Sequence, residues 1–234
     1  MKSIKRTARI AGLWYLFMGI GTGFSMGYVD SKLYTAGDMG ATVNNILASQ
    51  WLFLLGFMSN FAGLISFLFL ANSLYKLLVA VDRGQARLMF VFIIAGVSIT
   101  FLNMINQFAS VKLLSGAAHL SAFEPAQLQT VAMVFLDMHK SGKYIAGIFW
   151  GLWLFPLGML FFKSGFIPKV LSVLLMIGCF GYLINSLTFF FYQKYEAIIF
   201  QITTTPAGIA EILCILWLLI KGVKDQQPAL SEAI

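Results

Sequence analysis

Six apolar runs, each near the length needed to cross a membrane, constrain this chain most. A helix needs about 20 apolar residues to span the hydrocarbon core of a bilayer. Of the 234 residues, 59% are hydrophobic and 11% are charged, whereas a soluble domain carries about 25% charged residues. We therefore predict an all-α integral membrane protein, a bundle of six transmembrane helices at roughly 9–29, 50–80, 88–112, 140–162, 169–190 and 206–222.

The first run follows a basic segment, "MKSIKRTAR", as the core of a secretory signal does. It is too long for such a core, and no A-x-A-like cleavage site follows it, so we expect a retained span. The loops between the six runs are too short to hold a second domain. A single transmembrane domain over residues 1–234 is therefore expected.

Lysine and arginine predict the orientation, because cytoplasmic segments carry an excess of them. With the N-terminus inside, eleven of the 16 basic residues fall in inside segments. The other five are Lys32, Lys112, Lys140, Lys143 and Lys194. The bias favours both termini inside. It also explains the net charge of +7 without nucleic acid, whose binding is not expected.

The segment "FEPAQLQTVAMVFLDMHKSG" before the fourth run has Pro125 placed for a helix start. Its apolar residues recur as on one face of a helix, at Leu128, Val131, Val134 and Phe135. One interpretation is an extra amphipathic helix at the outer surface. The alternative is that the segment simply extends the fourth span.

Few polar residues interrupt the spans, and one of them is Glu211 in "TTTPAGIAEILCILWLLIKG". Membrane helices meet through small residues, so a polar residue beside glycine or alanine on one helical face is expected to point inward. Glu211 follows Ala207 and Gly208, and Asn60 sits between Gly56 and Gly63. The candidate ligand-binding residues chosen in this way are Glu211, Lys143, His139, Asn103, Asn106, Gln107, Asn185 and Asn60.

These candidates predict a polar cleft in the outer half of the bundle. Thr205 as N-cap and Pro206 in the first turn would start the last span, which puts Glu211 roughly 9 Å below the outer surface. Glu211 and Lys143 would be the charged groups of the cleft, and whether they pair is open. A carboxyl that exchanges a proton near neutral pH would suit proton coupling, which is the hypothesis for Glu211. The alternative is that the polar groups only hold helices together.

Catalytic chemistry is the less favoured class. No nucleophile and base converge in the pattern, since Ser141, His139 and Lys143 lie in one local run. No catalytic residue, metal site or cofactor is predicted. The only histidines are His119 and His139, and Cys179 and Cys214 both fall in apolar runs, as small buried residues do.

Several stretches resemble a bacterial family of multi-pass membrane proteins known as domain of unknown function 4386. They include "TARIAGLWYLFMGIG", "LANSLYKLLVAVDR", "PAGIAEILCILWLLIKGV" and, most specifically, "GLWLFPLGMLFFKSGFIPKVLSVLLMIGCFGYLI". The resemblance implies six spans and the bacterial cytoplasmic membrane, and it supplies no activity. It also implies that Leu54, Asn60 and Asn185 replace charged residues of the family, whereas His139 and Glu211 match its pattern.

Binding or transport of a small molecule through the outward-facing cleft is the function we expect. The alternative is a membrane-embedded accessory protein without a substrate. The expected partners are membrane lipid and a small-molecule ligand, and a homodimer is a common solution for so small a bundle.

Overall fold

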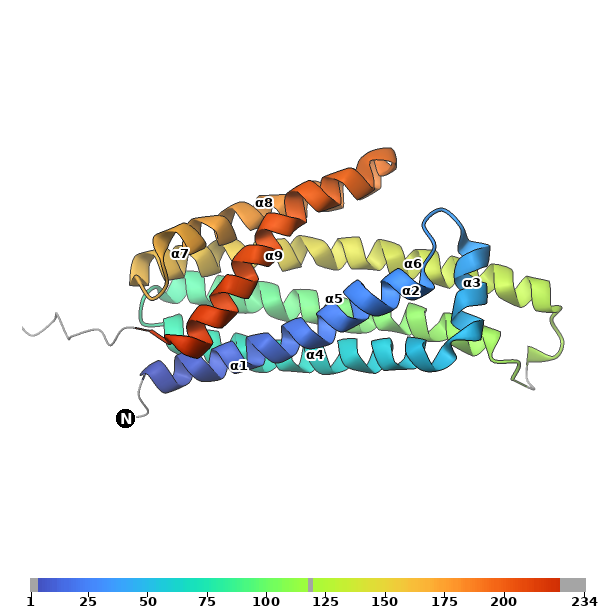
Figure 1. The fold of residues 1–234 in the computed structure, drawn as a ribbon, viewed down its shortest axis with the longest axis horizontal. Helices are drawn as coiled ribbons and strands as arrows, with labels where there is room; N and C mark the ends of the chain where they lie inside the picture. The colour runs from blue at the N-terminus through green and yellow to red at the C-terminus, as the bar shows by residue number, and fades with distance from the viewer. Residues whose placement is uncertain (1–3, 118–119, 224–234) are drawn as a thin grey trace, which may run out of the picture. The chain divides into compact units, whose positions relative to one another are not determined.

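The computed structural model describes residues 4–117 and 120–223, and every regular element within them is helical. His119, Lys2 and Lys224, used above, lie outside the described residues. The elements along the chain (Figure 1) are α1 (Ile4–Gly23), η1 (Phe24–Val29), α2 (Asp30–Leu33), α3 (Met39–Ala48), α4 (Gln50–Leu78), α5 (Arg83–Leu114), α6 (Pro125–Leu152), α7 (Leu154–Ser164), α8 (Lys169–Phe191), η3 (Gln193–Tyr195) and α9 (Glu196–Ile220).

Six stretches of helix are long and apolar enough to cross a membrane, as the sequence predicted. They are Ile4–Leu33, Gln50–Leu78, Arg83–Leu114, Pro125–Ser164, Lys169–Phe191 and Gln193–Ile220. The all-α bundle of six spans is therefore confirmed. The orientation of the termini stays a prediction.

The chain divides into two compact units. Unit 1 holds the described residues up to Leu16, then Phe69–Ile93, and those from Trp150 onward. Unit 2 holds Phe17–Leu68 and Ile94–Phe149. Each boundary falls inside a helix, in α1, α4, α5 or α6, so neither unit is a separate sequence domain. The single transmembrane domain over 1–234 stays a prediction.

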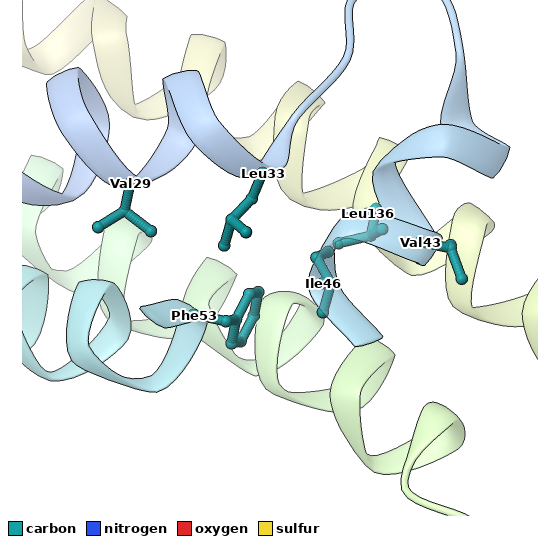
Figure 2. Packing of buried hydrophobic residues seen from close by; sticks show 6 residues of the cluster. All are labelled: Val29, Leu33, Val43, Ile46, Phe53 and Leu136. Atoms are coloured by element: carbon teal, nitrogen blue, oxygen red, sulfur yellow. The ribbon is translucent and has the colours of Figure 1, made fainter. Parts of the chain in front are cut away.

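Unit 2 contains a helix that the sequence did not predict. The segment 30–49 was taken as an outer loop, yet α3 occupies Met39–Ala48, with Asp38 as its N-cap accepting from Ala41 N at 2.8 Å. Helix α3 forms because it carries a buried apolar face. Its Val43 and Ile46 join a core cluster in which side chains from α2, α3 and α4 converge (Figure 2). That cluster is Val29, Leu33, Val43, Ile46, Phe53 and Leu136.

Close helix packing in unit 2 depends on glycine. Ser59 Oγ donates to the Gly21 carbonyl at 3.0 Å, and a Cβ on Gly21 would lie 2.6 Å from the Ser59 carbonyl oxygen. A Cβ on Gly56 would lie 2.7 Å from Val29. The backbones of the first two spans therefore approach through small residues, as expected in a membrane. Gly23 and Gly27, by contrast, have open surroundings.

In unit 1, α7 and α9 both pack against α8 (Figure 1). The fourth span breaks at Trp153, three residues before Pro156. Proline lacks an N–H and is tolerated in the first turn of a helix, so α7 restarts with Pro156 near its beginning. The fourth span is thus built of two helices, α6 and α7.

One predicted helix start differs from the structure, and another, at Pro125, is where α6 begins. The last span does not begin at Pro206: α9 begins at Glu196, so Thr205 is not an N-cap and Pro206 lies inside the helix. An interior proline is tolerated in a membrane helix because neighbouring groups satisfy the freed carbonyl. In the fourth span, Pro125–Leu152 is one continuous helix. This agrees with the alternative in which the amphipathic segment extends the span. The depth assigned to Glu211 from residue 205 therefore loses its basis.

Candidate functional site

Glu211 in unit 1 is held by two tyrosines. Its Oε2 accepts a hydrogen bond from Tyr15 Oη at 2.8 Å, and its Oε1 accepts one from Tyr182 Oη at 3.4 Å. Tyr15 is fully buried, whereas Glu211 keeps part of its surface exposed. The carboxyl is therefore satisfied by two neutral donors from α1 and α8.

Small residues bring these donors within reach of Glu211. A Cβ on Gly178 would lie 2.8 Å from Ala207 Cβ, and a Cβ on Gly181 would clash with the Thr203 carbonyl. Helices α8 and α9 thus lie close enough for Tyr182 to reach Glu211. Ala207, which the sequence pattern places beside Glu211, is one of the contact points, as expected for small residues between membrane helices.

Lys143 in unit 2 forms an ion pair with Asp30. The Lys143 Nζ lies 3.0 Å from Asp30 Oδ2, and the two side chains keep 29% and 19% of their surface exposed. Asp30 directly follows the π-helical turn η1, and both residues lie within candidate spans. Lys143 and Glu211 each have a partner inside their own unit.

Tyr34 lies beside this ion pair, and Gln107 is a neighbour of the Tyr34 phenol. The Lys143 ammonium lies 5.6 Å from the centroid of the Tyr34 ring, a cation–π geometry. Burial raises the pKa of the Tyr34 phenol, and the Asp30 carboxylate acts in the same direction. The Tyr34 hydroxyl is buried and has no hydrogen-bond partner among the described residues. Gln107 itself is buried. We call Asp30, Tyr34, Gln107 and Lys143 the Asp30 cluster.

Asn103 and His139 form a clasp between α5 and α6. Asn103 Nδ2 donates to the His139 carbonyl at 2.8 Å, and His139 Nδ1 lies 3.2 Å from the Asn103 carbonyl. A carbonyl only accepts, so Nδ1 carries the proton. Asn106 Nδ2 donates to Asn103 Oδ1 at 3.1 Å. A Cβ on Gly142 would clash with the Asn103 side chain, so this glycine makes room for the clasp.

Asn60 and Asn185 are buried, and their side-chain oxygens have no hydrogen-bond partner within the described part of the chain. Asn60 belongs to unit 2 and Asn185 to unit 1. A buried amide oxygen without a donor is unfavourable. These two residues are therefore the least satisfied of the candidates.

The eight predicted residues fall into separate groups. Unit 1 holds Glu211 and Asn185, and unit 2 holds Lys143, His139, Asn103, Asn106, Gln107 and Asn60. Their assignment to one ligand site stays a prediction.

The sequence reasoning missed Asp30, Tyr15 and Tyr182. Asp30 lies just beyond the first predicted run, 9–29, and tyrosines were not among the polar residues considered. The position of Asp30 directly after the first apolar run was the available signal.

Metal and thiol chemistry find little support in the described residues. No three His, Cys, Asp or Glu side chains are grouped there as metal ligands would be. Cys179 and Cys214 are buried and form no disulfide. Both thiols occupy the apolar positions that the sequence indicated.

Comparisons with known proteins give a family without an assigned activity. The family model described as Domain of unknown function (DUF4386) matches residues 10–222. An uncharacterised protein of Archaeoglobus fulgidus is 40% identical over 87 residues, which are 37% of this chain and 47% of that protein. The chain thus spans about half the length of this relative, and no solved structure matches. Since the family model covers nearly all six spans, the chain belongs to the family of domain of unknown function 4386.

Proposed function

We propose that this protein binds a small polar molecule at the Asp30 cluster, as an integral protein of the bacterial cytoplasmic membrane. The observation that carries the proposal is the Lys143–Asp30 ion pair, which lies within candidate spans and keeps both side chains partly exposed. Charges in a membrane span normally face a protein interior or a water-filled cavity. A solute that enters such a cavity could reach both charges.

The chemistry of the cluster suits a ligand with an ionised group and a hydrogen-bonding group. The Lys143 ammonium donates to an anion, the Asp30 carboxylate accepts from a cation, and Gln107 offers an amide. The Tyr34 ring already lies over the ammonium at 5.6 Å and adds an apolar wall. A ligand would exchange with the ion pair rather than fill a preformed void.

The π-helical turn before Asp30 supports a functional reading. Single π-helical turns insert an extra residue into a helix and are frequent at functional sites. Here η1 spans Phe24–Val29 and is followed at once by Asp30. If η1 were regular α-helix without the extra residue, the Asp30 carboxylate would point about a fourth of a turn away from its present direction around the helix axis.

Native mass spectrometry of protein released from lipid nanodiscs tests the proposal. We expect a co-purified small molecule on the wild type and its loss from Lys143→Gln and from Asp30→Asn. Lys112→Gln is the matched control, because Lys112 lies on α5 and contacts the Phe108 ring, at 5.4 Å, rather than the cluster.

The alternative is an accessory protein without a substrate, in which the cluster only joins helices. No adduct on any form, together with lower thermal stability of Lys143→Gln and Asp30→Asn, would support that alternative. An adduct lost from Glu211→Gln but retained by Lys143→Gln would move the site to unit 1.

A further inference from the structure

Glu211 carries a carboxyl group into a candidate span, and no cation of the described chain neutralises it. The titratable groups around the carboxyl are Tyr15 on α1, Tyr182 on α8 and Cys214 on α9, all in unit 1. Within residues 4–117 and 120–223, Glu211 forms no ion pair. An ionised carboxylate in a span is unfavourable without an opposite charge. A cation from solution would neutralise it, and a proton is the smallest such cation.

The two phenols around Glu211 can serve its carboxyl group in both protonation states. The hydroxyls of Tyr15 and Tyr182 donate to the carboxylate at 2.8 and 3.4 Å. A phenol oxygen also accepts a hydrogen bond, so a protonated carboxyl can donate to one tyrosine while the other tyrosine still donates to it. An ammonium group, which only donates, would require the ionised form. The site is therefore suited to gaining and losing a proton.

The two carboxyl oxygens of Glu211 are not equivalent. The bond from Tyr15 to Oε2, at 2.8 Å, has the usual length for two oxygens, whereas the bond from Tyr182 to Oε1, at 3.4 Å, is long. Oε1 is thus the oxygen with more capacity for a proton. When a proton from water binds there, one O–H bond forms and the negative charge is neutralised. The Tyr182 hydroxyl then turns so that its oxygen accepts, and Tyr15 keeps its bond to Oε2.

The surroundings of the carboxyl leave it accessible. Glu211 keeps part of its surface exposed, although Tyr15 beside it is fully buried. Gly208 lies one turn earlier on the same face of α9, and no described atom lies within 4 Å of its Cβ position. The absence of a side chain at Gly208 therefore leaves open space on the face of α9 that carries Glu211.

We propose that Glu211 is a reversible proton-binding site, which takes up a proton from water at Oε1 and alternates between an ionised and a neutral carboxyl. This inference goes beyond the binding of a small polar molecule at the Asp30 cluster. It gives unit 1 a ligand of its own, the proton. Proton uptake turns the Tyr182 hydroxyl, so the pH alters the contact between α8 and α9.

Infrared difference spectroscopy of the full chain in lipid nanodiscs tests the proposal, because a protonated carboxyl has a C=O stretching band that a carboxylate lacks. The pH is lowered from about 8 to about 5, the range of physiological proton switches. The wild type should gain this band, and Glu211→Gln should lose it. Glu124→Gln is the matched control and should keep the band, because it removes an exposed carboxyl directly before α6.

A second pair of variants tests the site with its carboxyl intact. Tyr15→Phe removes the donor to Oε2, which is the carbonyl oxygen of the protonated group, and should move the band to a higher frequency. Tyr75→Phe, on α4 with its ring against Phe90, should leave the frequency unchanged. This pair also tests the site if Glu211→Gln folds poorly.

Three results would overturn the proposal. The first is a wild type that gains no such band over this pH range. The second is a band that Glu211→Gln retains in full. The third is a Glu211 carboxylate band that shifts on addition of Na⁺ at constant pH, which would assign a metal cation to the site in place of the proton.

Discussion

Glu211 in unit 1 and Lys143 in unit 2 are both ionisable residues within candidate spans, and the protein satisfies them differently. Glu211 accepts from two neutral phenols, at 2.8 and 3.4 Å. Lys143 is paired with the opposite charge of Asp30 at 3.0 Å. Phenol donors serve a carboxyl group in either protonation state, whereas an ion pair requires both charges. The comparison teaches that neutralising Lys143 should be far more damaging than neutralising Glu211.

The largest expected effect is at Lys143. Lys143→Met leaves the Asp30 carboxylate in a span without its cation, which costs about 3–5 kcal/mol in a fully buried pair and, with both side chains partly exposed, about 2 kcal/mol here. Unfolding in mixed detergent micelles measures the loss. Asp30→Asn/Lys143→Met should recover about half of it, and strictly additive single and double variants would contradict the pairing.

The second-largest expected effect is at Gly142, which adjoins the Asn103 clasp in unit 2. Gly142→Ala places a methyl group against Asn103 and should lower the unfolding free energy by about 1.5 kcal/mol, the usual range for overpacking. The same unfolding assay measures it. Gly208→Ala is the control, since no atom lies within 4 Å of its Cβ position; an equal loss in both variants would show that the Asn103 clasp is not responsible.

Glu211→Gln should have a small effect. The glutamine retains an oxygen that accepts from Tyr15 and should cost less than about 1 kcal/mol of unfolding free energy, because such bonds between membrane helices contribute about 0.6 kcal/mol on average. Tyr15→Phe, which removes the shorter bond, should cost more than Glu211→Gln. A loss in Glu211→Gln as large as that in Lys143→Met would break the comparison.

The smallest effect is at the ion pair between Asp82, which lies between α4 and α5, and Lys163, near the end of α7. Lys163 Nζ lies 2.6 Å from Asp82 Oδ2, and hydrogen bonding by Lys163, followed by the Gln85 N–H, lowers the pKa of Asp82 from 3.8. A carboxyl group whose pKa is lowered by folding stabilises the folded state at pH values above its pKa in the unfolded chain. This stabilisation is lost as the pH falls through the pKa of the folded state. The melting temperature of Asp82→Asn should therefore lie below that of the wild type at pH 7, and the gap should shrink at pH 3. If the difference in melting temperature persisted at pH 3, the ionised Asp82 carboxylate would not be its cause.

The bundle of six spans could be predicted because the length and hydropathy of each apolar run are enough by themselves to favour its transfer into hydrocarbon. The boundaries were less predictable. The sequence predicts a helix start at Pro206, yet α9 begins ten residues earlier, at Glu196. Neighbouring helices, which a sequence window does not show, decide whether an interior proline is tolerated.

The sequence also identified Glu211, Lys143, Asn103 and His139 as candidate site residues, because polar groups are conspicuous in and beside apolar runs. It did not identify their partners. Asp30 and Lys143 are 113 residues apart, and Tyr15 and Glu211 are 196 apart. No local pattern connects positions so distant along the chain.

The sequence by itself determined that this chain enters a membrane, how many times it can cross, and that Glu211 and Lys143 enter with it, because hydropathy and charge act residue by residue. Only the tertiary structure decided that Glu211 meets two tyrosines and that Lys143 meets Asp30. The contact between Tyr182 and Glu211, for example, depends on how closely α8 and α9 approach at Gly178 and Gly181, which is a property of packing between different segments of the chain.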